Sequence, residues 1–313
     1  MGAALALSER TRGQTAPNPN VGCVIVREGR VVGRGWTQPG GRPHAEAMAL
    51  AEAGEQARGA TAYVTLEPCA HQSPRGPACA DLLAAAGVAR VVAALRDPDP
   101  RTDGRGLERL AAAGIATAHD LRSEDARRSM AGFLTRRALG RPHVTLKLAT
   151  SLDGCIALAN GESRWITGPE ARAHVHLERA LHEAVLVGRG THDADAPKLD
   201  VRLAGLEGRS PRRVLLSTHP VDGYRTIASP GAVAELDGID HLLVEGGAQT
   251  AASFLQADLV DRFLLYRAPI LLGGGLPALG DIGLTHLSEA HGRWRRLDGR
   301  TLGSDRLEVY AGL

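Results

Sequence analysis

Short runs of aliphatic residues alternate with alanine-rich segments along most of the chain, and this alternation limits the fold more than any other feature. A buried run of about four to eight β-branched residues is typical of a strand, and a longer stretch rich in Ala, Glu and Leu is typical of a helix. Such alternation predicts layered α/β sheets. In the first half we expect strands at 21–26, 31–32 (a hairpin with the first), 61–66, 88–95 and 115–118, and helices at 44–57, 78–86 and 106–113.

A second series of the same kind begins near Gly140-Arg141-Pro142, a sequence that favours a break. Residues 123–138, just before it, predict one charged surface helix. Beyond it we expect strands at 144–149, 184–187, 213–217, 242–245 and 262–272, helices at 169–181 and 248–256, and a closing hairpin that includes 298–299 and 306–311. A chain of 313 residues is long enough for about two domains. We therefore predict domains over residues 1–140 and 141–313.

Composition excludes several classes of protein. Lys and Arg number 37 against 35 Asp and Glu, a net charge of +2, which disfavours nucleic-acid partners. No apolar run approaches the roughly 20 residues of a membrane helix, and residues 1–12 lack the pattern of a secretory signal. Four cysteines are too few for a disulfide scaffold, which suggests a reducing, cytoplasmic compartment with paired cysteines as metal ligands.

One constellation in the first half predicts a catalytic metal. His44-Ala45-Glu46 precedes Glu67-Pro68-Cys69 and then Cys79. His44, Cys69 and Cys79 would give zinc three ligands and leave the fourth tetrahedral position to water. Glu46, at the start of the expected helix, is placed to accept a proton from that water and return it to the substrate. This arrangement is the signature of zinc nucleobase deaminases.

The alternatives to that interpretation are structural. A lone His or buried Cys usually packs in a core, and a structural zinc site normally has four protein ligands, of which no fourth is evident here. Cys23 and Cys155 lack such partners, so we interpret both as packing residues.

Several segments of the first half resemble the bifunctional riboflavin-biosynthesis family, in which a diaminohydroxyphosphoribosylaminopyrimidine deaminase is fused to a 5-amino-6-(5-phosphoribosylamino)uracil reductase. They are Asn18-Pro19-Asn20-Val21-Gly22-Cys23-Val24, His44-Ala45-Glu46, Thr65-Leu66-Glu67-Pro68-Cys69-Ala70-His71 and residues 85–92, 97–100 and 104–106. The resemblance implies a cytidine-deaminase-like α/β/α layered domain. It also implies that Asn18 and His71 bind the pyrimidine and that Arg75 contacts the phosphate, although Arg75 on its own could equally be a solvated loop charge.

The spacer between Cys69 and Cys79 differs slightly from the family pattern. It is one residue longer than usual, and Gly76-Pro77-Ala78 replaces the common Thr-Pro-Pro before the second cysteine.

The second half, taken alone, does not declare a function. Glu245-Gly246-Gly247 between a strand and a helix would let backbone amides approach a phosphate, but a turn without a ligand remains open. No GxGxxG follows a strand, so a Rossmann fingerprint is absent. However, Lys147-Leu148-Ala149, Ser151-Leu152-Asp153-Gly154, residues 161–167 and Val244-Glu245-Gly246-Gly247 resemble the reductase domain of the same family.

This second resemblance implies a dihydrofolate-reductase-like α/β fold that uses NADPH/NADP+. The cofactor residues that it implies are Ala149, Trp165, Thr191, Asp195, Ser217, Gly247, Ala248, Gln249, Thr250, Ala251, Ala252 and Ser253. The substrate residues that it implies are Ser163, Arg179, Leu199, Arg202 and Glu245, with the two arginines facing a sugar phosphate. A lone Trp such as Trp165 is otherwise usually a packing residue.

The expected activity is deamination of a phosphoribosylaminopyrimidine followed by reduction of its ribosyl chain to ribityl, in a homo-oligomer. Two alternatives stay open. The first is a deaminase of a free nucleoside, cytosine or tRNA adenosine. The second is a deaminase whose reductase-like half is degenerate, because Ala196 follows Asp195 where the family has a second aspartate, Leu216 replaces a common aspartate, and the stretch between Ser217 and Asp240 is short.

Overall fold

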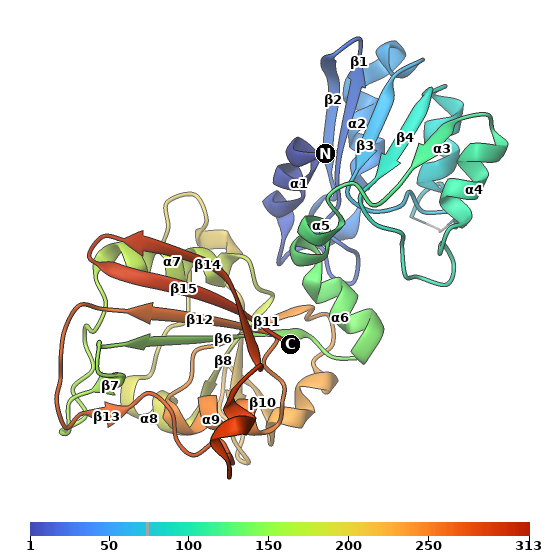
Figure 1. The fold of residues 1–313 in the computed structure, drawn as a ribbon. Coiled ribbons are helices and arrows are strands. Elements are labelled where there is room, and N and C mark those ends of the chain that lie inside the picture. The colour runs from blue at the N-terminus through green and yellow to red at the C-terminus, as the bar shows by residue number, and fades with distance from the viewer. Residues whose placement is uncertain (73–74) are drawn as a thin grey trace. The chain divides into compact units, whose positions relative to one another are not determined.

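The protein is described here by a computed structural model that covers residues 1–72 and 75–313. The chain separates into two compact units, Met1–Gly140 and Arg141–Leu313. Each unit has its own sheet and its own helices (Figure 1), and each is described by itself.

The described residues of the first unit form a five-stranded sheet in the order β2-β1-β3-β4-β5. The strands are β1 (Gly22–Arg27), β2 (Arg30–Trp36), β3 (Thr61–Val64), β4 (Arg90–Ala93) and β5 (Ala116–Ala118). β1 pairs antiparallel with β2 and β3, so the predicted hairpin is confirmed. The pairs β3–β4 and β4–β5 are parallel, as expected where helices connect successive strands.

Helices lie on both faces of this sheet (Figure 1). They are α1 (Gly2–Ser8), α2 (Ala45–Ala53), α3 (Cys79–Ala85), α4 (Arg105–Ala112), α5 (Ser123–Ser129) and α6 (Ala131–Leu139). A side chain at Gly22 would collide with the Ala4 carbonyl of α1, and one at Gly35 with the Ala45 carbonyl of α2. Gly22 is paired with Trp36, the neighbour of Gly35, so the two glycines face opposite sides of the hairpin. The predicted α/β/α layering is confirmed.

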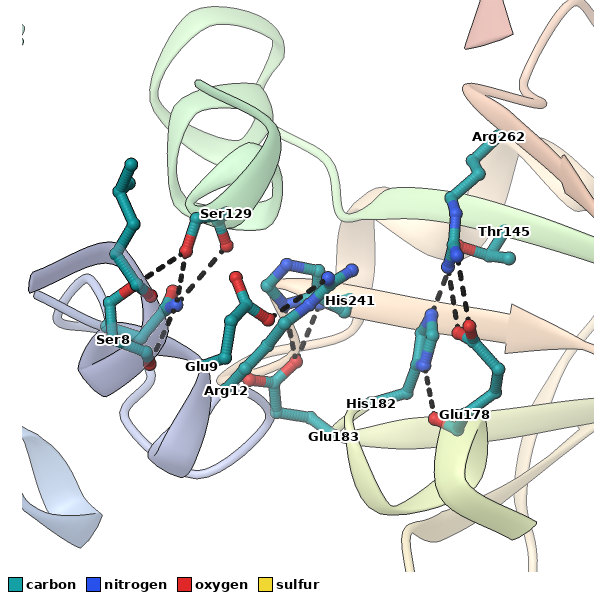
Figure 2. Close-up of polar contacts among 12 residues, drawn as sticks. Ser8, Glu9, Arg12, Ser129, Thr145, Glu178, His182, Glu183, His241 and Arg262 are labelled. Carbon is teal, nitrogen blue, oxygen red and sulfur yellow. Dashed lines mark hydrogen bonds and ion pairs between the residues drawn. The ribbon is translucent and has the colours of Figure 1, made fainter. Parts of the chain in front are cut away.

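The prediction of one surface helix over 123–138 is wrong. The segment forms α5 and α6, separated at Met130, whose φ of −103° and ψ of 21° interrupt the helix. Met130 and Phe133 are buried in the core, and the Ser129 hydroxyl hydrogen-bonds that of Ser8 at 2.8 Å (Figure 2). The many charged residues of the segment predict a surface helix, although Met130 and Phe133 pack into the core.

The second unit, residues 141–313, is built on an eight-stranded sheet in the order β10-β9-β8-β11-β6-β12-β15-β14. The strands are β6 (His143–Thr150), β8 (Ala184–Gly188), β9 (Arg212–Leu216), β10 (Arg225–Ile227), β11 (His241–Val244), β12 (Arg262–Arg267), β14 (Trp294–Leu302) and β15 (Asp305–Gly312). The pairs from β10 to β12 are parallel, and β15 adds antiparallel to β12 and to β14.

Three helices flank this sheet: α7 (Pro169–Ala180), α8 (Arg189–Asp195) and α9 (Ala248–Gln256). The predicted strand 262–272 is too long. β12 ends at Arg267, shortly before Pro269, which has no N–H to donate to a ladder. Residues beyond it reach β13 (Leu276–Pro277), which pairs with β7 (Cys155–Ala157) in a separate two-stranded sheet.

The short stretch after Ser217 still completes the sheet. It contains β10 and a 3-10 helix, Pro230–Glu235. Ile227, Val233 and Leu236 from this stretch are buried in the main hydrophobic cluster of the unit. This short connection therefore still contributes side chains to the core.

A buried polar cluster fixes helix α7 to the sheet (Figure 2). His182 Nδ1 donates to the Glu178 carbonyl at 2.6 Å, and its Nε2 accepts from the Thr145 hydroxyl at 3.1 Å. Arg262 on β12 donates to both carboxylate oxygens of Glu178, at 2.8 and 2.9 Å. These contacts hold α7 in place, and with it the residues that α7 contributes to the second cavity described below.

Within the described ranges, every helix is too short or too polar to cross a lipid bilayer.

Candidate active sites

The predicted metal ligands meet at one end of the first unit's sheet. His44 is the residue immediately before α2, Cys69 lies in the loop after β3, and Cys79 is the first residue of α3. Their ligand atoms all lie within 4.8 Å of one another, and both cysteines are buried. Among the His, Cys, Asp and Glu side chains of the described residues, these three form the one group close enough together to hold a metal ion.

The spacing of these atoms fits zinc. His44 Nδ1 is 3.3 Å from Cys79 Sγ and 3.7 Å from Cys69 Sγ. Zinc–nitrogen and zinc–sulfur bonds of about 2.0–2.3 Å put tetrahedral ligands about 3.3–3.8 Å apart. Three ligands at this spacing, with the described residues offering no fourth, match a catalytic rather than a structural site.

The first turn of α3 favours a thiolate at Cys69. The backbone N–H of Cys79 donates to Cys69 Sγ at 3.3 Å. A hydrogen bond from the Cys79 side chain, assisted by His44, lowers the pKa of the Cys69 thiol, whereas the same contact and burial raise the pKa of Cys79, so without a metal the thiolate of the pair forms at Cys69. A thiolate is the form that binds zinc.

Glu46 lies in the first turn of α2, two residues after His44. It is buried, and this burial raises the pKa of its carboxyl group to about 7. A carboxyl group with a pKa near neutrality can both accept and donate a proton under physiological conditions.

The other predicted deaminase residues lie on the wall of a cavity of about 180 Å³ that also includes His44, Glu46 and Cys69. Asn18 donates its amide to the Gly41 carbonyl at 2.7 Å. His71 Nδ1 is 3.4 Å from the Thr102 hydroxyl. Arg75 donates to the Gly40 carbonyl at 2.7 Å. All three therefore line the cavity that contains the candidate metal ligands His44 and Cys69.

Glu67 joins the cysteine loop to the opposite wall of the same cavity. One of its carboxylate oxygens accepts the N–H groups of Gly106 and Leu107, at 2.9 and 3.2 Å, and the other accepts those of Asp97 and Gly104, at 3.2 and 3.0 Å. The side chain is 2% exposed. The buried carboxylate of Glu67, two residues before Cys69 in the sequence, thus fixes the backbone of residues 97–107.

Sequence reasoning missed several polar residues on this wall: Arg42, Glu67, Asp97, Asp99, Arg101 and Arg137. Arg101 and Arg137 both donate to Asp99, at 2.6 and 2.7 Å for their shortest bonds, and lower the pKa of its carboxyl group. Burial instead raises the pKa of Asp97 to about 6. The Asp97–Pro100 motif was the available signal, but its loop position gave no indication of which side chains turn inward.

The second unit has a larger cavity of about 580 Å³. Ten of the predicted reductase residues line it: Ala149, Ser163, Trp165, Arg179, Thr191, Asp195, Leu199, Arg202, Glu245 and Gly247. Trp165 is 65% exposed, with the Arg172 guanidinium 4.8 Å from its ring centroid, so it is not a core residue. Leu199 is 2% exposed and packs against Val187, which leaves mainly its backbone for a ligand.

Arg179 and Glu245 form a buried ion pair on the wall of this cavity. Arg179 also donates to the Asp200 carbonyl at 3.0 Å. Burial alone would raise the pKa of Glu245, but the Arg179 charge and its hydrogen bonds lower it overall. Arg202 is exposed, with a 3.5 Å ion pair to Asp200. The two arginines predicted to face a phosphate therefore differ, because Arg179 is already paired and Arg202 is largely solvated.

Other predicted cofactor residues lie outside the wall of this cavity in the described structure: Ser217, Ala248, Gln249, Thr250, Ala251, Ala252 and Ser253. Ser217 directly follows β9 and is half-buried, and its hydroxyl donates to the His219 carbonyl at 2.9 Å. The other six form the first turns of α9, and Ala251 packs in the core. Gly247, which precedes α9, donates its N–H to the Thr191 hydroxyl at 3.1 Å.

Lys147 and His176 are ionisable residues on this wall that the sequence reasoning did not single out. Lys147 on β6 is beside Glu245, and burial lowers the pKa of its amine. His176 on α7 has its Nδ1 3.0 Å from the Asp200 carbonyl, and burial lowers its pKa. Lys147 breaks the apolar run of an otherwise buried strand, a signal that was available.

Comparison with known proteins identifies the family of each half. Residues 1–95 match the cytidine and deoxycytidylate deaminase zinc-binding region, and residues 142–305 match the RibD C-terminal domain. The riboflavin biosynthesis protein RibD of Escherichia coli is 42% identical over 340 aligned positions, which cover 93% of this chain and 92% of that protein. RibD of Aquifex aeolicus is 38% identical over 92% of this chain and 90% of its own.

The chain belongs to the RibD family. A solved structure of Acinetobacter baumannii RibD is 36% identical, with a TM-score of 0.87 over 100% of this chain and 97% of that one. A Thermotoga maritima protein, described as a diaminohydroxyphosphoribosylaminopyrimidine deaminase/5-amino-6-(5-phosphoribosylamino)uracil reductase, is 31% identical with the same TM-score and coverage. As a RibD protein, the chain is an enzyme of riboflavin biosynthesis that joins a zinc-binding deaminase domain to a reductase domain.

Proposed function

We propose that His44, Cys69 and Cys79 hold the zinc of the deaminase half and that Glu46 is its proton-transfer residue. The observation that carries this proposal is the 3.3 and 3.7 Å spacing of the three ligand atoms beside a buried carboxyl group of raised pKa. Bound zinc supplies a Lewis acid that makes water nucleophilic at neutral pH. Glu46 takes the proton of the attacking water and delivers protons to the ring nitrogen and the departing amine.

The substrate of this half is 2,5-diamino-6-(5-phosphoribosylamino)pyrimidin-4(3H)-one. Asn18 and His71 stand on the wall beside the metal ligands, where an amide and an imidazole can pair with the donor and acceptor edge of a pyrimidine. Arg75 supplies a guanidinium for the phosphate on the same wall. A free nucleobase would leave that arginine without a function, which disfavours the nucleoside and cytosine alternatives.

The second half reduces the ribosyl chain of 5-amino-6-(5-phosphoribosylamino)uracil. Its cavity combines an open face at Trp165 and Thr191 with a charged end at Arg179, Arg202 and Glu245. NADPH, when bound, supplies the hydride. The glycine turn before α9 lets the backbone approach the cofactor phosphates, and the largely solvated Arg202 suits the sugar phosphate of the substrate. Lys147, whose amine has a pKa lowered by burial, lies on the same wall and can exchange a proton with the opened sugar.

Two assays on the full chain test both halves. Ammonia release from the diamino substrate should require bound zinc, and the deaminated compound should then consume NADPH, followed by its absorbance. Ammonia release without NADPH consumption would favour the degenerate-reductase alternative. If the chain neither releases ammonia nor consumes NADPH, the proposal is wrong for both halves. A homo-oligomer in the cytoplasm is the state we propose for the chain, and light scattering measures its size.

A further inference from the structure

Four arginines stand on the wall of the deaminase cavity: Arg42, Arg75, Arg101 and Arg137. Arg101 and Arg137 share the Asp99 carboxylate, and Arg75 donates to the Gly40 carbonyl. Arg42 differs from these three. Among residues 1–72 and 75–313 it has no hydrogen-bond or ion-pair partner, although it is only partly exposed. None of its guanidinium nitrogens is among the buried unpaired side-chain atoms of these residues, so they reach solvent and can contact an anion that enters the cavity.

The local backbone aims Arg42 at the loop that carries Arg75. A Cβ atom placed on Gly76 would lie 2.7 Å from Arg42 Nη1. Gly76 has a φ of +146°, which side-chain-bearing residues rarely adopt, so glycine here both permits this backbone and leaves room for the guanidinium. Position 76 falls within the segment where this chain departs from the usual Thr-Pro-Pro. The departure and the space for Arg42 therefore coincide.

Arg42 is also tied to the pyrimidine side of the cavity. It follows Gly40 and Gly41, whose carbonyls accept hydrogen bonds from Arg75 and Asn18, each at 2.7 Å. Gly40 thus contacts Arg75, the residue proposed to bind phosphate, and Gly41 contacts Asn18, the residue proposed to bind the pyrimidine. Arg42, the next residue, adds an unpaired positive charge beside them. Two guanidinium groups that approach one loop repel each other unless an anion lies between them.

We propose that Arg42 and Arg75 together bind the 5-phosphate of the deaminase substrate, and that Arg42 makes this half selective for the phosphorylated compound. A phosphate dianion offers three acceptor oxygens, enough for two arginines. Arg101 and Arg137 are disfavoured for this role because both already form ion pairs with Asp99. This inference rests on the deaminase function proposed above and adds to it a residue that sets the substrate class.

The first test compares two substrates on the zinc-loaded full chain: the phosphorylated pyrimidine and its dephosphorylated riboside. For Arg42→Ala we expect KM for the phosphorylated substrate to rise about 10- to 100-fold, with KM for the riboside unchanged within about twofold. Arg42→Lys should recover part of the difference, since it restores charge without the fork. The matched control is Arg30→Ala on β2, an exposed arginine away from the cavity, and it should change neither constant.

A second test does not depend on turnover. In chains that also carry Arg202→Ala, so that the proposed phosphate site of the reductase half does not contribute, titration calorimetry with D-ribose 5-phosphate should give a Kd about tenfold or more higher with Arg42→Ala than without it or with Arg30→Ala. Equal Kd values, or a KM that rises equally for both pyrimidines, would overturn the role of Arg42. A chain that releases no ammonia but still shows the Kd difference would refute the deaminase proposal and leave the phosphate site standing.

Discussion

The guanidinium of Arg179 donates to both carboxylate oxygens of Glu245, at 2.6 and 2.9 Å, and both side chains are largely withdrawn from solvent. A bidentate pair of this kind orients both groups on the wall of the reductase cavity. It also means that neither residue can be removed without leaving a buried charge behind.

Arg179→Ala should therefore destabilise the reductase half by about 3–5 kcal/mol, because the Glu245 carboxylate would remain buried without its partner. The double variant Arg179→Ala with Glu245→Ala should lose less stability than Arg179→Ala alone. Denaturant unfolding of the unmodified chain, the two single variants and the double variant measures this coupling. If the double variant loses, relative to the unmodified chain, the sum of the two single-variant losses, the pair contributes nothing as a pair.

Arg202→Ala should act on binding and leave stability nearly unchanged, because Arg202 is 60% exposed and its ion pair with Asp200 is 3.5 Å long. Loss of one arginine–phosphate contact should raise the reductase KM about tenfold or more, with ammonia release by the other half unaltered. Steady-state kinetics should compare the reductase KM of Arg202→Ala with that of Arg225→Ala. Arg225 is an exposed arginine on β10 and serves as the control. An unchanged KM would remove Arg202 from the phosphate site.

Glu46→Gln should keep zinc and lose ammonia release by at least about 10²–10⁴-fold, because the amide preserves the shape but cannot carry the proton. Metal analysis and an ammonia assay on the same sample separate the two effects. Deamination at the unmodified rate would assign proton transfer to another group.

Cys79→Ser should lower the zinc content of the purified chain severalfold, since a hydroxyl group is a much poorer zinc ligand than a thiolate. Cys155→Ser is the matched control, because Cys155 is also a buried free thiol but belongs to the reductase unit. Full zinc occupancy in Cys79→Ser would contradict the ligand assignment.

Asp97 predicts a pH dependence of stability. Burial raises its pKa in the folded chain to about 6, above the unfolded value near 3.8. The folded state then holds this proton more tightly, so the stability gained is present below about pH 4 and is lost as pH rises through 6. Asp97→Asn should thus gain about 2–3 kcal/mol relative to the unmodified chain between pH 4 and pH 8. Unfolding free energies that shift in parallel for both chains would show that Asp97 titrates normally.

Much of the architecture was predictable because its signals are local. The buried aliphatic run of β8 is typical of a strand, and the alanine-rich sequence of α9 is typical of a helix. Gly140 ends α6 in the left-handed backbone conformation that favours glycine. The metal ligands were predictable because zinc restricts residue type and spacing together. By contrast, α1 has no capping side chain or charged first turn to mark it, and the division at Met130 depends on packing against Ser8.

The remaining site residues depend on tertiary structure. Arg42 and Arg137 are far apart in the chain and have ordinary surface sequences around them, so nothing local indicates that they reach one cavity. Leu199 illustrates the opposite error. The resemblance placed it correctly at the reductase cavity, but only its burial against Val187 shows that its side chain belongs to the core.

Glu67 constrains how the deaminase half can change over evolution. Its single carboxylate clamps four amide groups of residues 97–107 and sits two positions before a metal ligand. An insertion or deletion within residues 97–107 would leave the buried Glu67 carboxylate without hydrogen-bond donors. It would also shift the loop that carries Cys69. New substrate preferences in this half should therefore arise by exchanging side chains such as Arg42 on an inherited frame, and lengthened or shortened versions of the clamped loop should be rare among its descendants.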